Sequence, residues 1–213
     1  MARAGLNADR VAEAAADMAD EIGFDSITMS ALARHFGVRD ASLYSHVKSV
    51  RELRTRVALI ATRDLVDRIE AAMADRAGRP ALAAFAGAYR DFAHERPGRY
   101  AATQIQLDPA VAASSDAVRR TLELIDGMLR SYGLGDPDRT DAVRLLRSAF
   151  HGYVSLEAIG GFGHPRAVSE SWDRIVESLH FLLTNWPSEA GKEPGAPEPG
   201  KCGAPEPKEN EDA

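Results

Sequence analysis

The sequence lacks the features that disulfide-stabilised, membrane-spanning or secreted proteins carry. Its 213 residues include a single cysteine, Cys202, so one chain can form neither an internal disulfide nor a cysteine-based metal site. No run of about eighteen apolar residues is present, which leaves no candidate for a transmembrane helix. The first residues, MARAGLNADR, lack the hydrophobic stretch and cleavage site of a secretory signal. We therefore expect a cytoplasmic protein without a membrane partner.

Signatures of common enzymes are also missing. The patterns H-E-x-x-H, G-x-S-x-G, Walker A, C-x-x-C and a glycine-rich dinucleotide loop after a strand do not occur. Glu177 and His180 have the i, i+3 spacing of a di-iron ligand pair, but that chemistry needs a second such pair, and the sequence has none. We expect no catalytic residues, no bound metal and no cofactor.

Alternating apolar and polar residues, the pattern of a half-buried strand, are scarce. Apolar residues instead recur with the 3.6-residue period of an amphipathic helix along most of the chain. The expected fold class is all-α, with about nine helices in two domains, residues 1–50 and residues 51–186. Residues 187–213 form an acidic tail that is rich in proline and glycine and lacks large apolar residues, and we expect this tail to be disordered.

The net charge of −6 hides an uneven distribution of charge along the chain. Between Thr28 and Arg56 there are six Lys or Arg residues and two Asp or Glu residues. The segment after Trp186 has the opposite balance, with three Lys residues and seven Asp or Glu residues. Affinity for phosphate depends on where positive charges lie rather than on their sum. The basic N-terminal segment is therefore compatible with a nucleic-acid partner in spite of the acidic total.

Helix start and stop signals divide the N-terminal domain into three helices. Asn7 caps the first, which Gly23 ends, and Thr28 caps a short second helix that ends at Gly37. A third helix follows within three residues, over about residues 40–46. Two short helices that are joined by a tight turn and packed on a first helix are typical of a helix-turn-helix.

The exposed face of the third helix is rich in groups that bind DNA. Arginine can form a forked contact with guanine, while Ser, Tyr, His and Lys suit phosphate oxygens. The N-terminal amides of the second helix can receive a further phosphate. The alternative is an ordinary solvated surface. The candidate DNA-binding residues on these two helices are Thr28, Ser30, Arg39, Asp40, Ser42, Tyr44, His46 and Lys48.

A capping box, Ser49-x-x-Glu52, opens a long fourth helix that the apolar pattern extends to about residue 75. At 1.5 Å per residue this helix would span roughly 40 Å, enough to connect the two domains. Glycine and proline separate the helical segments that we expect beyond it, at about residues 80–95, 97–106, 110–132, 137–161 and 168–186.

The stretch from Thr28 to Leu53, TMSALARHFGVRDASLYSHVKSVREL, resembles the signature of the TetR family of transcriptional regulators. The resemblance implies that Tyr44 and His46 grip DNA phosphates. It also implies that residues 39–42, Ala41 among them, meet the bases.

Two positions depart from the pattern of this family. Arg39 stands where many relatives have a serine cap, and Val50 stands where they have a phosphate-binding lysine. The operator sequence therefore cannot be inferred from relatives. We hypothesise that Lys48 and Arg51 replace the missing lysine.

The C-terminal domain carries a second resemblance. Residues 150–157, FHGYVSLE, are similar to the W-H-G-F-x-x-L-E pattern of the WHG subgroup of TetR-like regulators, with Phe150 in place of the tryptophan. This pattern says nothing about which ligand the domain would bind.

The last two expected helices are apolar on more than one face, so they must be covered on more than one side. One stripe is expected to pair with its symmetry mate, as in TetR relatives: Ile175, Leu179, Leu182 and Trp186. Such a dimer would present two recognition helices about one DNA turn, roughly 34 Å, apart, and would bind a palindromic operator. The alternative is packing within one chain.

Aromatic residues with sparse polar tips give the C-terminal domain the composition of a small-molecule pocket. The candidate ligand-binding residues are Phe92, Tyr100, Gln104, Phe150 and Tyr153. Aromatic residues at helical spacing also form ordinary core, and this alternative stays open for each of the five.

These features predict a ligand-responsive transcriptional repressor. It would bind a palindromic operator in double-stranded DNA as a homodimer, and an unidentified small-molecule effector would release it. The alternatives are an activator, or a constitutive DNA-binding regulator without an effector, on the same scaffold.

Removal of residues 187–213 is expected to leave the melting temperature almost unchanged, because no large apolar side chain in this segment can join a core. Thermal unfolding of the full-length and the truncated chain, followed by circular dichroism, measures the difference. A drop of several degrees would show instead that the tail is docked on a folded domain.

Overall fold

The structure, a computed structural model, describes residues 6–187 and is helical with no strand over that range, which confirms the all-α fold class. Residues 188–213, and with them nearly all of the predicted tail, lie outside the described residues. The helices are α1 (Ala8–Ile22), the 3-10 helix η1 (Phe24–Ser26), α2 (Met29–Phe36), α3 (Asp40–Tyr44), α4 (Val50–Met73), α5 (Gly78–Glu95), α6 (Pro97–Ala102), α7 (Pro109–Ser114), α8 (Asp116–Arg130), α9 (Asp138–Ala158) and α10 (Val168–Thr184).

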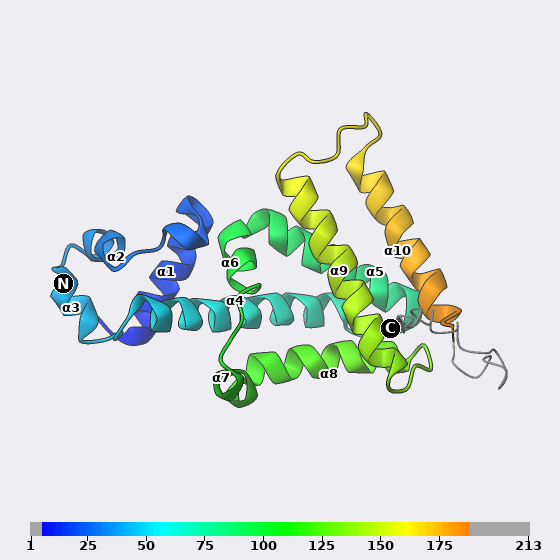
Figure 1. Cartoon of the computed structure of the whole chain (residues 1–213), viewed down its shortest axis with the longest axis horizontal. Helices are drawn as coiled ribbons and strands as arrows, with labels where there is room; N and C mark the ends of the chain where they lie inside the picture. Colours follow the sequence, from blue (N-terminus) through cyan, green and yellow to red (C-terminus); the bar gives the residue numbers. More distant parts are fainter. Residues whose placement is uncertain (1–5, 188–213) are drawn as a thin grey trace, which may run out of the picture.

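The molecule is elongated, with α1 to α3 at one end and α10 at the other (Figure 1). The N-terminal end, here called the head, consists of α1 to α3 and the first half of α4 around a core of its own. The side chain of Asn7 accepts a hydrogen bond from the backbone of Arg10 at 2.8 Å, and Thr28 accepts one from Ala31 at 3.1 Å. Gly37 ends α2 with a left-handed φ of +64°. The predicted caps of α1 and α2 are therefore present.

Helix α4 runs from the head into the rest of the molecule and has 24 residues, a length of roughly 36 Å. Its residues Leu53, Val57 and Ala61 belong to the core of the head. Ile69 and Met73, two to three turns further on, belong to a second core. The two cores are thus built on one shared helix.

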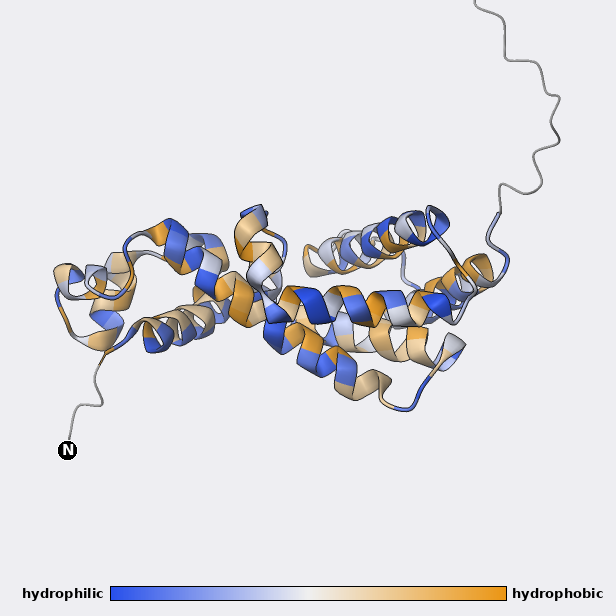
Figure 2. Ribbon diagram, turned by 90° about the horizontal axis from the view of Figure 1, so that it is seen from below, coloured by the Kyte–Doolittle hydropathy of each residue, from blue (hydrophilic) through white to orange (hydrophobic). Residues whose placement is uncertain are grey.

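The second half of α4 and helices α5 to α10 form the C-terminal lobe. Helix α5 lies in its middle and contacts α4, α9 and α10. Figure 2 shows that hydrophobic and hydrophilic residues alternate around most helices, as expected when each packs through one face. None of the helices within residues 6–187 combines the length and the apolar character needed to cross a bilayer.

The prediction of a single helix over residues 110–132 is wrong, because the structure has two helices there, α7 and α8. Ser115 adopts an extended conformation between them, and its side chain accepts a hydrogen bond from the backbone of Val118 at 3.3 Å. A serine followed by an aspartate, as in Ser115-Asp116, is a helix start signal. That signal separates the two segments.

The stripe expected to form the dimer contact on α10 points partly inward. Leu179 is 5% exposed and belongs to the core of the lobe, so it cannot face a partner. Leu182 is exposed, as expected, and Phe181 beside it is exposed to a greater degree. The outward apolar face of α10 is therefore rotated from the predicted stripe towards Phe181.

A partly buried ion pair ties α5 to α9. Arg90 donates hydrogen bonds to both carboxylate oxygens of Glu157, at 2.9 and 2.5 Å, and His94 lies 2.9 Å from the same carboxylate. The guanidinium of Arg90 also lies 5.5 Å from the ring of Trp172 on α10. The hydrogen bonds from Arg90 hold the pKa of Glu157 below its usual value.

The substitution Glu157→Gln is expected to lower the free energy of unfolding by about 1–3 kcal/mol at pH 7, because the partly buried Arg90 loses the carboxylate with which it pairs. The folded-state pKa of Glu157 lies below the unfolded value of about 4.3. Its stabilising effect is therefore complete above that unfolded value and is lost as the pH falls through the folded one.

Urea denaturation of the wild type and of Glu157→Gln between pH 7 and pH 3 measures the free energy of unfolding of each. The difference between the two values should become smaller towards pH 3. Glu123→Gln, which changes an exposed carboxylate paired with Arg119, is the matched control and should have little effect. A difference that stays constant across the pH range would contradict the expected role of the Glu157 charge.

Candidate DNA-binding surface and aromatic core

A hydrogen bond joins the two helices of the helix-turn-helix. Ser30 Oγ on α2 donates to Asp40 Oδ2 on α3 at 2.5 Å. Thr28 and Ser30 therefore both have a structural part at the start of α2, besides their predicted contacts with phosphate. The carboxylate of Asp40 therefore already accepts a hydrogen bond from α2. The other exposed residues at the start of α3 have no hydrogen bond of this kind to α2: Arg39, Ala41 and Ser42.

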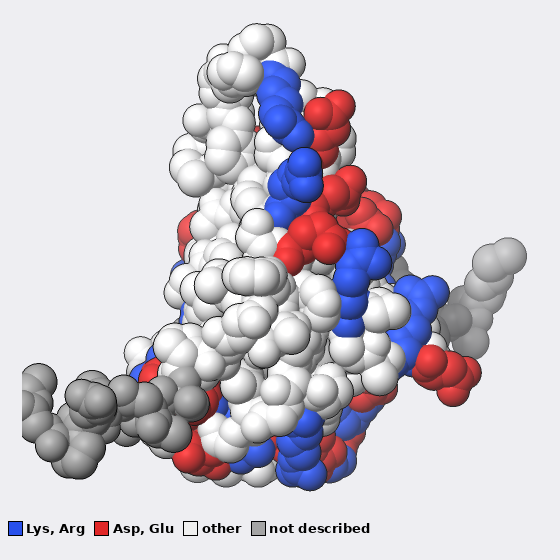
Figure 3. All heavy atoms as spheres, turned by 90° about the vertical axis from the view of Figure 1, so that its right-hand side faces the viewer, with Lys and Arg blue, Asp and Glu red and all other residues white. Residues whose placement is uncertain are grey.

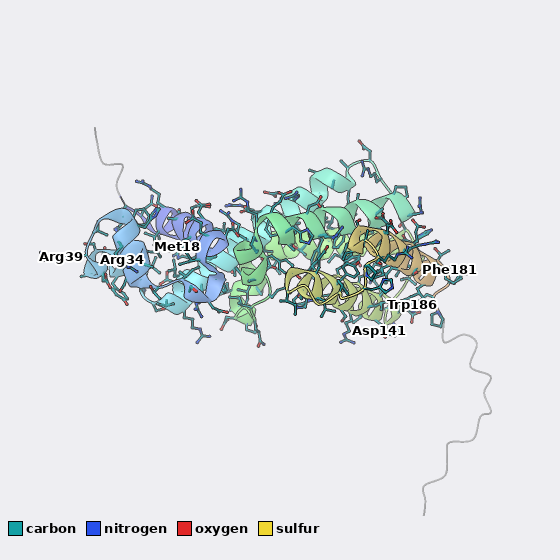
Figure 4. The ribbon with its side chains drawn as sticks, turned by 90° about the horizontal axis from the view of Figure 1, so that it is seen from above. Met18, Arg34, Arg39, Asp141, Phe181 and Trp186 are labelled. Atoms are coloured by element: carbon teal, nitrogen blue, oxygen red, sulfur yellow. The ribbon has the colours of Figure 1, made fainter. Side chains whose placement is uncertain are left out.

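The remaining predicted DNA-binding residues lie on the outside of α3 and the turn after it. Leu43 and Val47 are fully buried in the core of the head, while Tyr44 is about half exposed and His46 is partly exposed. The buried pair fixes the orientation of α3, so Tyr44 is held outward. Figure 4 shows Arg34 and Arg39 at the outer tip of the head.

The basic residues of this region divide into two groups. Arg54 donates to a backbone carbonyl of η1 at 2.8 Å and lies over the ring of Phe24, and Arg56 pairs with Glu52 at 3.0 Å. Arg54 therefore braces α4 against η1, whereas Arg56 pairs within α4 and also lies 3.7 Å from Asp9 of α1. The exposed basic residues, which suit phosphate contacts, are Arg34, Arg39, Lys48 and Arg51.

The start of α4 is fixed by a reciprocal pair of hydrogen bonds. Ser49 Oγ accepts from the backbone N–H of Glu52 at 3.1 Å, and the Glu52 carboxylate accepts from the N–H of Lys48 at 2.9 Å. The hydrogen bond from Lys48 is the main reason that the pKa of Glu52 lies below its usual value. The capping box is thus present, although Glu52 reaches one residue further back than the pattern requires, and it holds the backbone that carries the exposed Lys48 side chain.

Aromatic rings in contact run through the core of the C-terminal lobe. Ring centroids are 5.5 Å apart between Tyr100 and Tyr89, 5.9 Å between Tyr89 and Phe150, 5.4 Å between Phe150 and Trp172, and 4.9 Å between Trp172 and Tyr153. Three of the five candidate ligand-binding residues are therefore brought together, with Tyr89 and Trp172 between them.

A chain of polar groups lies at one end of this aromatic core. The hydroxyl of Tyr100 is 2.9 Å from the hydroxyl of Tyr89 and 2.7 Å from Nδ1 of His151. Burial raises the pKa of both tyrosines, so both hydroxyls keep their protons at neutral pH. The side chains of Gln104 and Ser155 lie near these two tyrosines as well. A molecule entering between α5, α6 and α9 would meet these polar groups.

The other candidate ligand-binding contacts are dispersed. The hydroxyl of Tyr153 donates to the backbone carbonyl of Val168 at 2.5 Å and so anchors the start of α10. Gln104 lies just beyond α6, where its amide donates to Thr103 at 2.7 Å, and its side chain also lies near Tyr89. Phe92 lines a surface hollow between α4 and the end of α5. That these residues bind a ligand stays a prediction.

One charged cluster has no signature in the sequence. Arg99 on α6 is 7% exposed, the one charged residue buried within residues 6–187, and it pairs with Asp17 and Asp20 on α1. These partners lie about eighty residues earlier in the chain, so residue spacing could not reveal the cluster. The only local signal is the proline and glycine at the start of α6.

A capped helix-turn-helix with exposed basic residues, joined by α4 to a separate helical lobe, defines a DNA-binding transcriptional regulator. The chain is 37% identical over 161 residues to the uncharacterized HTH-type transcriptional regulator Rv0681 of Mycobacterium tuberculosis, with 74% of this chain and 72% of that protein covered. It is 31% identical over 183 residues to the HTH-type regulator YobS of Bacillus subtilis, with 85% and 91% covered. Residues 82–179 match the family model described as tetracyclin repressor-like, C-terminal domain. The chain belongs to the TetR family, which confirms the resemblance.

Solved structures share the fold. A crystal structure of BioQ with its natural double-stranded DNA operator matches with a TM-score of 0.56 and 21% identity, over 83% of this chain and 99% of that one. The arrangement of a helix-turn-helix head on a helical lobe is therefore common to both proteins. The matched family model is not described as the WHG subgroup, so that finer resemblance is not confirmed.

Proposed function

We propose that the protein is a ligand-responsive transcriptional repressor that binds an inverted-repeat operator as a homodimer. The observation that carries the proposal is the position of two exposed surfaces at opposite ends of the molecule. The polar surface of α2 and α3 lies at one end, and the exposed Phe181 of α10 lies at the other (Figure 4). The similarity to a structure of BioQ with its operator adds support.

The apolar surface has the character of an interface between two copies of the chain. Two large apolar side chains near the end of α10 are exposed, Phe181 (66%) and Leu182 (44%), and two more are exposed at the end of α9, Leu156 (45%) and Ile159 just after the helix (78%). Figure 3, which faces the end of the molecule that carries α10, shows broad uncharged areas beside a line of charged residues. Exposed apolar surface of this kind marks a site of association. A twofold pairing here would leave both heads free for DNA.

Selection of bound sequences from random DNA tests the proposal. The full-length protein is expected to enrich an inverted repeat whose half-sites are about one helical turn, roughly 34 Å, apart. Enrichment of a single half-site without a repeat would contradict the dimeric mode of binding.

The ligand response rests on the polar group at Tyr89, Tyr100 and His151. An effector that hydrogen-bonds these atoms must part α5, α6 and α9, because the aromatic rings pack against one another in this conformation. Coupling of about 1–3 kcal/mol to the head would weaken operator binding some 5- to 150-fold. By reciprocity, operator DNA would weaken effector binding by the same factor.

The close packing of these rings is also the observation that favours the second candidate, a constitutive DNA-binding regulator. A panel of metabolites tested on the protein bound to its selected operator separates the two. A compound that lowers operator affinity supports the ligand response, and a panel in which none does so favours the constitutive regulator.

The substitution Phe181→Asp is expected to convert the dimer to a monomer, because it places a charge beside Leu182 in the exposed apolar surface at the end of α10. Sedimentation velocity measures the oligomeric state. Leu122→Asp, which changes an exposed leucine on α8, is the matched control and should leave the dimer intact. If Leu122→Asp dissociated the dimer and Phe181→Asp did not, the interface would lie on α8.

The substitution Lys48→Ala is expected to lower operator affinity and to reduce the slope of log affinity against log salt by about 1, since one phosphate contact is lost. Arg39→Ala is expected instead to relax the base preference at one operator position, at a cost of about 1–3 kcal/mol. Fluorescence anisotropy over a salt series measures both variants.

Arg130→Ala serves as the control, because Arg130 is exposed at the end of α8 and away from the head. An unchanged affinity and salt slope for Lys48→Ala would show that Lys48 does not replace the lysine missing at position 50.

A further inference from the structure

Helix α6 connects the two parts of the molecule by a route separate from α4. It contacts α1 of the head as well as α4 and α5 (Figure 1). Ala102 at its end is fully buried in the core of the head, and Ile105 and Leu107 beyond it pack against the same core. A segment far along the chain therefore completes the core of the DNA-binding head.

The start of α6 lies against the backbone of α1 without an intervening side chain. A Cβ atom at Gly98 would lie 2.0 Å from both the carbonyl carbon and the oxygen of Ala19, and 2.5 Å from the nitrogen of Asp20. No side chain fits at these distances, because the atoms it would meet are backbone. Position 98 thus requires glycine, and it sets the separation of α6 from α1.

Arg99 fixes the direction of the contact that Gly98 permits. Its backbone N–H donates to Asp20 Oδ1 at 2.9 Å, and its guanidinium donates to Asp20 Oδ2 at 2.8 Å and to Asp17 Oδ1 at 2.9 Å. Its Nε also lies 3.2 Å from Asp64 Oδ2 on α4, without the geometry of a hydrogen bond. One planar cation therefore holds two points on α1 and touches α4.

The next residue, Tyr100, belongs to the other core. Its hydroxyl makes the contacts with Tyr89 and His151 described above. Consecutive residues on a helix point about 100° apart, so α6 directs Arg99 to the head and Tyr100 to the lobe. A rotation or shift of α6 must move both contacts together.

We propose that the contact of Gly98 and Arg99 with α1 fixes the tilt of each head on its lobe, and thereby sets the half-site spacing that the dimer selects. Gly98 and Arg99 are positioning residues that touch no DNA. The proposal rests on the proposed function, since a spacing exists only for a dimer on a repeated site.

Selection from random DNA with the full-length wild type and Gly98→Ala tests the proposal. Gly98→Ala is expected to enrich the same half-site sequence as the wild type but with a shifted or broadened spacing. Its affinity for the operator selected by the wild type should fall about tenfold, within the range of couplings between distant sites. Gly127→Ala is the matched control, because a Cβ at Gly127 in α8 meets no atom within 4 Å, and its spacing and affinity should equal those of the wild type.

A second variant covers the case in which Gly98→Ala does not fold. Arg99→Lys keeps the charge but loses the fork that reaches both aspartates, so it should also broaden the spacing. Arg119→Lys, which changes an exposed arginine paired within α8, should not. A folded Gly98→Ala or Arg99→Lys protein that selects the wild-type spacing with wild-type affinity would overturn the proposal.

A measurement without DNA keeps this inference separate from the proposed function. Spin labels at Ser45→Cys on the head and Ser131→Cys at the end of α8, in a Cys202→Ser background diluted with unlabelled protein, report the distance from head to lobe. Gly98→Ala should shift or broaden that distance, and an unchanged distribution would overturn the proposal. If the wild type enriches no repeat while this distance does change, the dimeric operator model fails and the role of α6 stands.

Discussion

The architecture depends on α4 being buried at both of its ends. A helix with one apolar stripe would pack into one core, but α4 places Leu53 and Val57 in the head and Ile69 and Met73 in the lobe. Neither core is complete without it, so the two parts cannot separate without exposing apolar residues of α4. A head that is joined to the lobe through one helix alone can nevertheless tilt when that helix bends or twists. The second contact, from α6 to α1, restricts that movement.

Most of the head could be predicted from the sequence because its signals are local. Each residue that marks a helix end makes a hydrogen bond to the backbone within a few residues of itself: Asn7, Thr28, Ser49, Gly23 and Gly37. The exposure of Tyr44 likewise follows from the spacing of Leu43 and Val47, which are both buried. The bond from Ser30 to Asp40 was not predictable in this way, since it depends on how α2 crosses α3.

The C-terminal lobe was less predictable, because what decides it is which helix faces which. The sequence correctly predicted that α10 is a helix, but it did not predict which side of the helix faces outward. Leu179 packs in the core of the lobe, whereas Phe181 is exposed. The aromatic residues were recognised as a group, but the sequence could not show that the hydroxyl of Tyr153 is bonded to Val168. The ion pairs of Arg99 could not be predicted for the same reason, because Asp17 and Asp20 are distant from it in the chain.

The buried position of Arg99 has a consequence for how tightly the two parts are joined. An arginine that loses its carboxylates while still buried is strongly destabilising, so the ion pairs with Asp17 and Asp20 will break only if the whole contact opens to water. Asp64 stands at ion-pair distance from the same guanidinium but is not hydrogen-bonded to it, and it also pairs with Arg63. The contact therefore holds α1 firmly and α4 loosely. A movement of α6 would be passed to the head through the hydrogen bonds with α1 more directly than through Asp64 of α4.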